Sequence, residues 1–347
     1  MLQSISIISL TTGGGSITAK EHFEQPPFFE IQELFDSSPK ERIPKLAVAA
    51  DGSILAFTRS CGLLRRSEDA GASWGPVQEL ASGGANVIVD RNTGDILLLL
   101  PSKDALWRSG DHGKTWHRED VAILPNAVGH GTSGHSPSSG GASEAGITLQ
   151  HGAHQGRLLM PVRIQPPAGS NAQENWAYNY NTSTYSDDSG RTWQVGEPVQ
   201  SGTGEGGLME LSDGRIYYNS RCHMAVDNRR LIAWSHDGGH RWVDWQACDT
   251  LREVGEPFYF KYGSRPSYGC NAGLAKLPLA TTNGKDVLLF STPDNPGSTR
   301  VRMTVWMSSD GARTWSTKRL VYGGPSGYSS LAADEQGNIY LLFEVGK

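Results

Sequence analysis

The sequence has few cysteines and no long apolar segment. Its 347 residues include four cysteines, which lie far apart and form no Cys-x-x-Cys pair: Cys61, Cys222, Cys248 and Cys270. This spacing excludes a zinc ribbon and favours buried free thiols. No apolar run approaches the roughly 18–20 residues that cross a bilayer, so no membrane span is expected.

An excess of one charge is also lacking. The formal net charge is −5 and the isoelectric point is about 6.1, with acidic and basic residues interspersed. Proteins that bind nucleic acid usually carry a basic patch, so nucleic acid is not an expected partner. The chain has neither a nucleotide or phosphate motif nor a dense acidic loop for calcium, so we expect no cofactor and no bound metal.

The N-terminus lacks a convincing secretory signal. The apolar patch at residues 5–10 is short, and no Lys or Arg precedes it, whereas a signal peptide begins with a basic segment. We expect residues 1–20 to form a mobile tail, with a signal remnant or a fragmentary gene start as alternatives. The compartment stays open, with a secreted, periplasmic or lysosome-like location favoured over the cytoplasm.

No stretch of ten or more residues has the periodicity and caps of a helix. Instead the chain, with 42 Gly and 18 Pro, repeats the phrase Ser-x-Asp-x-Gly-x-Thr-Trp, with at most one or two departures in a copy, at residues 67–74, 109–116, 186–193, 235–242 and 308–315. In such a phrase Asp accepts hydrogen bonds from backbone N–H groups, Gly supplies a positive φ, and the Trp ring is buried under the turn. Each copy therefore predicts a hairpin turn.

The spacing of the repeats predicts a toroidal fold. They start 42, 77, 49 and 73 residues apart, and a four-stranded propeller blade takes roughly 40–50 residues. Six short apolar runs, each too short for a buried helix, are expected to be inner strands: residues 54–57, 96–100, 157–162, 215–218, 287–290 and 339–343. The predicted fold is an all-β, six-bladed β-propeller, with residues 21–347 as a single domain.

Several polar segments between the repeats occur in a recognisable order. They are Arg42-Ile-Pro44, Glu205, the strand that ends with Arg221, Arg300-Val-Arg-Met-Thr304, Gly324-Pro-Ser-Gly-Tyr328-Ser-Ser-Leu331 and Glu344. With these segments and the five repeats, the chain resembles the Asp-box exo-α-sialidases (neuraminidases) over residues 35–344. Its wording is most similar to the lysosomal-type animal branch and its bacterial relatives. The resemblance implies six blades and the hydrolysis of terminal sialic acids from glycoproteins, glycolipids and oligosaccharides.

The resemblance also implies a role for each polar segment. Sialic acid carries a carboxylate on its anomeric carbon, and guanidinium groups offer forked donors that match such an anion. The family pattern assigns this clamp to Arg42, Arg221 and Arg300, with Arg302 as a close rival for Arg300. It assigns Glu344 to holding Arg42, Tyr328 to the nucleophile of a retaining mechanism, and Glu205 to the partner that takes the Tyr328 proton.

One position of the family pattern is missing. In the family, a loop after the first inner strand carries an Asp that acts as general acid and base. Here that loop is gone, and no carboxylate occurs between Asp51 and Glu68. Substitutes that the sequence offers, without favouring one, are Asp104, His130, His135, Glu144, His151 and His154. The histidine spacings also suggest zinc loosely, although histidines in a Gly/Ser-rich loop are usually solvated.

The end of the chain is a second departure. It stops three residues after Glu344, where family members usually add a closing strand, so residues 28–35 are expected to complete the last blade. A truncated chain would explain both departures. Two alternatives to an active sialidase therefore stay open: a catalytically impaired propeller that binds sialic acid as a lectin does, and an Asp-box propeller that acts on another acidic sugar, such as a uronate.

Overall fold

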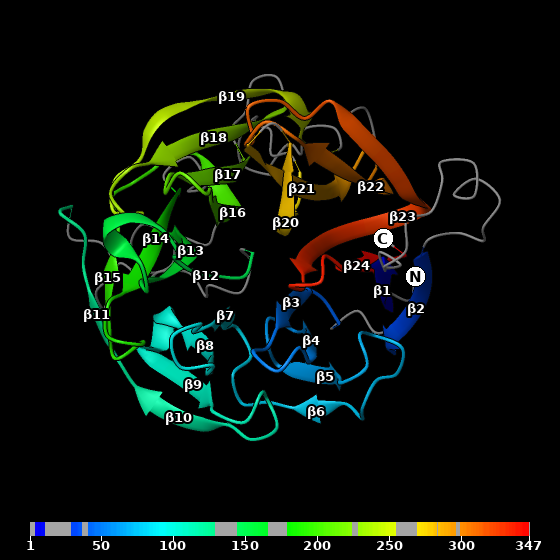
Figure 1. Cartoon of the computed structure of the whole chain (residues 1–347), viewed down its shortest axis with the longest axis horizontal. Coiled ribbons are helices and arrows are strands. Elements are labelled where there is room, and N and C mark those ends of the chain that lie inside the picture. Colours follow the sequence, from blue (N-terminus) through cyan, green and yellow to red (C-terminus); the bar gives the residue numbers. More distant parts are fainter. Residues whose placement is uncertain are drawn as a thin grey trace, which may run out of the picture.

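The strands form a closed ring around a central axis (Figure 1). The computed structural model describes residues 4–10, 29–36, 41–128, 144–165, 179–223, 228–254, 269–282, 284–295 and 299–346. Besides strands, these residues contain two short 3-10 helices, Pro101–Lys103 and Gly152–His154. No helix in the described part of the chain is long and apolar enough to cross a membrane.

Four sheets each extend outward from an innermost strand at the axis (Figure 1). The first contains β3 (Lys45–Val48), β4 (Ile54–Thr58), β5 (Leu63–Ser67) and β6 (Gln78–Glu79), and the second contains β7 (Asn86–Val89), β8 (Ile96–Leu100), β9 (Ala105–Ser109) and β10 (His117–Asp120). The third contains β12 (Ile147–Thr148), β13 (Leu158–Ile164), β14 (Tyr180–Ser186), β15 (Thr192–Val195) and, parallel to β15, β11 (Ala122–Leu124). The fourth contains β16 (Thr203–Glu210), β17 (Ile216–Cys222), β18 (Arg229–Ser235) and β19 (Val243–Arg252).

The remaining seven strands form one continuous sheet that contains two blades. Its order is β2 (Phe29–Phe35), β1 (Ser4–Leu10), β24 (Ile339–Val345), β23 (Thr317–Ala333), β22 (Val301–Ser308), β21 (Lys285–Pro293) and β20 (Gly273–Thr282). The first part of the long strand β23 pairs with β22, and its last part, from Ser326 onward, pairs with β24. Each half thus has four strands, and with the other four sheets the ring has six blades. The predicted all-β propeller is confirmed.

The N-terminal segment closes the ring in a way that the sequence analysis missed. The expectation of a tail over residues 1–20 is wrong for Ser4–Leu10, which form β1 and pair with β24 along its whole length. Residues 29–35 do join this blade, but they pair with β1 and not with β24. The physical reason is that β24 would otherwise present an unpaired edge.

The six apolar runs are the second strand of each blade, not the innermost one. They form β4, β8, β13, β17, β21 and β24, each hydrogen-bonded on both sides. A second strand is covered by neighbouring strands and by the adjacent blades, and in β4 and β8 every residue is buried. This burial explains why these strands have continuous apolar sequences.

The repeated phrases form turns as predicted. In the third copy, Asp188 accepts the N–H of Thr192 at 2.9 Å, Gly190 has φ 87°, and the ring of Trp193 is fully buried. Ser186 adds two contacts that the sequence did not predict. Its hydroxyl accepts the Gly190 N–H and donates to Asp188. The four cysteines are free and buried, as expected.

Candidate active site

Tyr328, Glu205 and Arg221 meet near the axis of the ring. Tyr328 lies on β23, and its hydroxyl donates to Glu205 Oε1 of β16 at 2.7 Å. Arg221 Nη1, from β17, donates to the same hydroxyl at 3.0 Å and to Glu205 Oε2 at 2.7 Å. All three residues are buried. The phenol therefore has a carboxylate that can take its proton and a cation that can stabilise its oxygen.

Glu344 joins Arg42 to the backbone of Tyr328. It lies on β24 with no exposed surface, and its Oε1 accepts Arg42 Nε at 3.2 Å and the N–H of Ile43 at 3.1 Å. Its Oε2 accepts the N–H of Tyr328 at 3.1 Å. Ile43 has φ 62°, an outlier for a β-branched residue, and such strain is often found at functional sites. The strained turn directs Arg42 toward the Tyr328 ring, 5.2 Å from its centroid.

Of the two rival arginines, Arg300 lies at the site. Its guanidinium is 5.3 Å from the centroid of the Tyr328 ring and donates to the carbonyl of Gly269 at 2.7 Å. Arg302 is exposed, with φ 67°. The six residues predicted by resemblance thus lie together, and three guanidinium groups surround one phenol.

The charges around Tyr328 determine its protonation and that of its partner. Burial opposes the ionisation of Glu205, but Arg221, Arg163 and His223 outweigh it and hold the pKa of that carboxyl well below its usual range. Burial and the Glu205 carboxylate raise the pKa of Tyr328 to about 12, although Arg221 and Arg300 counteract them. At neutral pH the resting pair is therefore a phenol and a carboxylate.

After β4, where the family pattern places the general acid, this chain forms a tight turn that carries Arg59. Three successive residues after β4, Arg59, Ser60 and Cys61, have φ of 53°, 50° and 65°. The Arg59 side chain, 38% exposed, forms an ion pair with the buried carboxylate of Glu41, and the Arg59 N–H donates to the carbonyl of Arg42 at 2.7 Å. The turn is thus fastened to the segment that carries Arg42.

The structure brings none of the substitute acids that it describes into contact with Tyr328. Asp104 is exposed and ends the first 3-10 helix, His154 lies at the rim beside Asp187, and the His151 N–H donates to Glu210. Glu144 is buried at the axis and accepts a hydrogen bond from Ser330. His130 and His135 lie outside the described residues. No group of three metal-ligating side chains occurs among the described residues.

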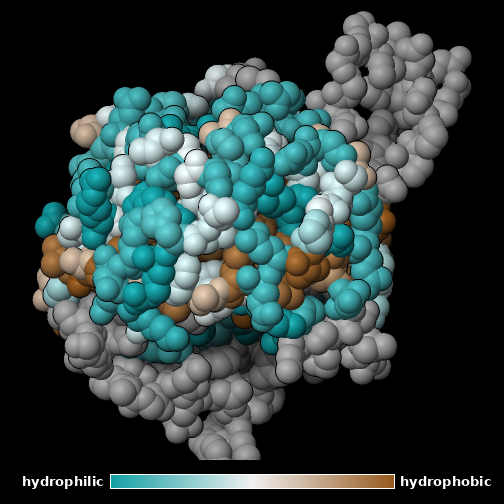
Figure 2. Space-filling view, turned by 90° about the horizontal axis from the view of Figure 1, so that it is seen from below, coloured by the Kyte–Doolittle hydropathy of each residue, from teal (hydrophilic) through white to brown (hydrophobic). Residues whose placement is uncertain are grey.

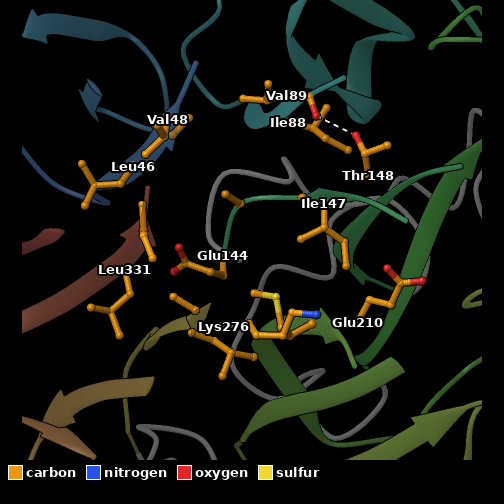
Figure 3. Close-up of a pocket in the computed structure, with 18 of the residues that line it drawn as sticks. Leu46, Val48, Ile88, Val89, Glu144, Ile147, Thr148, Glu210, Lys276 and Leu331 are labelled. Atoms are coloured by element: carbon orange, nitrogen blue, oxygen red, sulfur yellow. Dashed lines mark hydrogen bonds between the residues drawn. The ribbon is translucent and has the colours of Figure 1, made fainter. Parts of the chain in front are cut away.

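A cavity of about 360 Å³ lies on the axis (Figure 3). Its wall consists of the innermost strands and is mostly apolar, with Leu46, Ile88 and Leu331 among its residues. Leu46 follows Arg42, Met209 follows Glu205 on β16, and Leu331 follows Tyr328 on β23, so the cavity lies further along the axis than the site. The carboxylate of Glu144 is directed toward the side of the cavity where Leu46 and Leu331 lie (Figure 3).

Three further charged side chains are buried near the site, and the sequence did not single them out. Arg230 and Glu253 form an ion pair at 3.1 Å with almost no exposed surface, and Glu253 also accepts the N–H of Cys222, the residue after Arg221. Lys45 on β3 has no exposed surface. The groups that these charged side chains face come from other strands, so no local sequence motif could have revealed the three residues.

Comparisons with known proteins identify the family of this chain. A BNR repeat-like domain family matches residues 87–341. A sialidase of Micromonospora viridifaciens is 32% identical over 92% of this chain, which spans 53% of that relative's length. Two solved structures share the fold. The NanB sialidase of Streptococcus pneumoniae is 14% identical with a TM-score of 0.68, and the match covers 94% of this chain and 69% of that one. Trypanosoma rangeli sialidase in complex with 2,3-difluorosialic acid, described as a covalent intermediate, is 23% identical with a TM-score of 0.58, and the match covers 91% of this chain and 55% of that one. The chain belongs to the BNR-repeat sialidase family, whose fold is the β-propeller.

Proposed function

We propose that this protein is a retaining exo-α-sialidase that releases terminal sialic acid from glycoconjugates. The observation that carries the proposal is the Tyr328 hydroxyl, held between Glu205 Oε1 at 2.7 Å and Arg221 Nη1 at 3.0 Å. A phenol is a weak nucleophile unless a base takes its proton and a cation stabilises its oxygen. Both groups are in contact with it before any substrate binds.

In the proposed reaction, Tyr328 Oη attacks the anomeric carbon while its proton passes to Glu205. The bond from carbon to the glycosidic oxygen breaks as the bond to Tyr328 forms, and the departing oxygen takes a proton from water. A water molecule then attacks the same carbon, gives a proton to solvent, and Tyr328 leaves, recovering its proton from Glu205. Two displacements at one carbon retain the anomeric configuration.

The three arginines would bind the carboxylate of the substrate. Arg42 and Arg300 lie 5.2 and 5.3 Å from the centroid of the Tyr328 ring, and Arg221 contacts its hydroxyl. Forked guanidinium donors suit a carboxylate, and an anion bound there would hold the adjacent anomeric carbon beside the phenol oxygen. This placement favours an α-keto sugar acid over a neutral sugar.

The test compares an aryl sialoside, whose leaving group needs little protonation, with sialyllactose. General acid catalysis is worth about 10²–10⁴ in rate, so we expect turnover of the aryl compound and much slower turnover of sialyllactose. Proton NMR should show the α-anomer of sialic acid first, and 2,3-difluorosialic acid should label Tyr328 in the wild type but not in the Tyr328→Phe variant. A wild type that hydrolyses neither substrate contradicts the proposal.

A sialic-acid-binding protein with impaired catalysis is the second candidate. The observation that favours it is the turn after β4, where Arg59 is paired with Glu41 and no carboxylate of the turn itself is available. Binding of sialic acid without turnover of either substrate, lost in the Arg300→Ala variant, would support this candidate. Failure to bind sialic acid at all would favour another acidic sugar.

A further inference from the structure

Glu144 connects four innermost strands on the axis of the ring. Its carboxylate Oε1 accepts the hydroxyl of Ser330, which in turn accepts the N–H of Leu46 at 3.0 Å. Its own N–H donates to the carbonyl of Gly206 at 2.8 Å, and its carbonyl accepts Asn86 Nδ2 at 2.7 Å. A single residue thus joins β23 and β3 through its side chain and β16 and β7 through its backbone.

These contacts lie next to the residues of the proposed reaction. Ser330 is two residues after Tyr328 on β23, Gly206 directly follows Glu205 on β16, and Leu46 follows Arg42 at the start of β3. Because hydrogen bonds between Tyr328 and Glu205 depend on the placement of β23 relative to β16, a residue that fastens both strands controls that distance.

A buried cation accompanies the Glu144 carboxylate. Lys45 has no exposed surface, its Nζ has no hydrogen-bond partner among the described residues, and Glu144 is the carboxylate with the largest electrostatic influence on it. Glu144 Oε2 also lacks a partner there. Burying a single charge is costly unless an opposite charge is near, so the two groups compensate each other inside the ring.

We propose that Glu144 is a positioning residue, which keeps Tyr328 and Glu205 within hydrogen-bond distance of each other. It does so through its hydrogen bonds to Ser330 and Gly206 and through the opposite charge of Lys45. This inference depends on the proposed function only for its kinetic readout. Glu144 does not need to touch substrate, because it acts through the strands that carry the two reacting groups.

The protonation of Glu144 adds a pH dependence to this role. Burial raises the pKa of its carboxyl to about 7, although Lys45 and Ser330 oppose the shift. Cys61 and Glu205 are the other groups that influence Lys45, and the remaining charged or titratable side chains around the cavity are Arg91, His151, Glu210 and Lys276. When Glu144 gains a proton, Lys45 loses the carboxylate with the largest electrostatic influence on it, so the Tyr328–Glu205 hydrogen bond should loosen as pH falls below 7.

Three variants test the proposal. Glu144→Ala removes the contact with Ser330, Glu144→Gln keeps an acceptor for Ser330 but not the charge, and Glu210→Ala is a matched control. Glu210 is a buried carboxylate that lines the same cavity but accepts the N–H groups of Gln150 and His151. The measurements are kcat and KM with the aryl sialoside between pH 5 and 9, thermal unfolding, and crystal structures of the folded variants.

For Glu144→Ala we expect kcat to fall about 10- to 100-fold with KM within about 3-fold, because a misplaced reacting group costs rate more than binding. The Tyr328 Oη to Glu205 Oε1 distance, 2.7 Å here, should exceed about 3.2 Å. Glu144→Gln should lose the inflection of kcat near pH 7, and Glu210→Ala should keep the kcat, KM and pH profile of the wild type.

A folded Glu144→Ala with unchanged kcat and an unchanged distance would overturn the proposal. If Glu144→Ala does not fold, the proposal is overturned by a pH profile of kcat that keeps its inflection near pH 7 in Glu144→Gln. If the wild type does not hydrolyse the aryl sialoside, the proposed function fails. The crystallographic distances in the two Glu144 variants still decide whether Glu144 positions the pair.

Discussion

Replacing Glu344 by Gln should destabilise the fold and the site together. The carboxylate accepts three hydrogen bonds, from Arg42 and Ile43 at Oε1 and from the Tyr328 N–H at Oε2. A Gln side chain keeps one acceptor oxygen, so its NH₂ group must face at least one of these donors. If the oxygen stays with Arg42 and Ile43, the buried Tyr328 N–H loses its acceptor.

The size of the effect follows from burial. A buried donor left without an acceptor costs about 1–3 kcal/mol, and a bond to a neutral acceptor is weaker than one to a carboxylate by about 1 kcal/mol. Because the Arg42 side chain is 38% exposed, water replaces part of its lost contact, and most of the cost comes from Tyr328. We expect a loss of about 2–3 kcal/mol in the free energy of unfolding.

Urea denaturation measures this loss, and kinetics with an aryl sialoside measure its effect on the site. We expect KM to rise, because Arg42 is no longer held, and kcat to fall, because the Tyr328 backbone shifts. Glu335→Gln is a suitable control, since Glu335 is exposed and pairs only with Arg91 among the described contacts. A change of less than about 0.5 kcal/mol for Glu344→Gln, similar to an ordinary surface substitution, would refute the reasoning.

Three further predictions concern the clamp, the scaffold and acid stability. Arg300→Ala should raise KM about 10- to 100-fold through the loss of a charged hydrogen bond, whereas Arg302→Ala should leave KM within about 2-fold; equal effects would place the wrong arginine in the site. Asp188→Ala should lower the free energy of unfolding by about 1–2 kcal/mol without changing KM, as measured by denaturation and kinetics, because this turn lies away from the site. The pKa of Glu205 is lower in the folded protein than in the unfolded chain, so its stabilising contribution, present above about pH 4.5, is lost as pH falls below it. Between pH 6 and 3 the unfolding free energy of Glu205→Gln should therefore fall less steeply than that of the wild type, and parallel curves would contradict the assigned pKa.

The candidate site could be predicted to the extent that its residues stand in ordered local motifs. Arg42-Ile-Pro44, the strand before Arg221 and the Tyr328 segment were each recognisable by their neighbours, and the structure brings them together. The family pattern favoured Arg300 over Arg302, but the local sequence could not separate them, because both lie on one short stretch. Only the irregular backbone there, with Arg302 at φ 67°, decides which one faces Tyr328.

Contacts between distant strands could not be predicted. Glu144 was one of several possible acids in the sequence, and its bonds to Ser330 and Gly206 exist only because three blades meet at the axis. Arg230 and Glu253 likewise pair across two strands of one blade. Burial gives such charges their importance, and burial depends on the packing of the whole ring.

The sequence by itself determined the repeating turn, the short apolar strands and the order of the polar segments, because these features depend on neighbours a few residues apart. The closure of the ring by Ser4–Leu10 and the burial of Lys45 and Glu144 near one another were decided by tertiary structure. Each of these depends on which strand edges and which buried charges need a partner once the blades are packed, and that need does not exist in the unfolded chain.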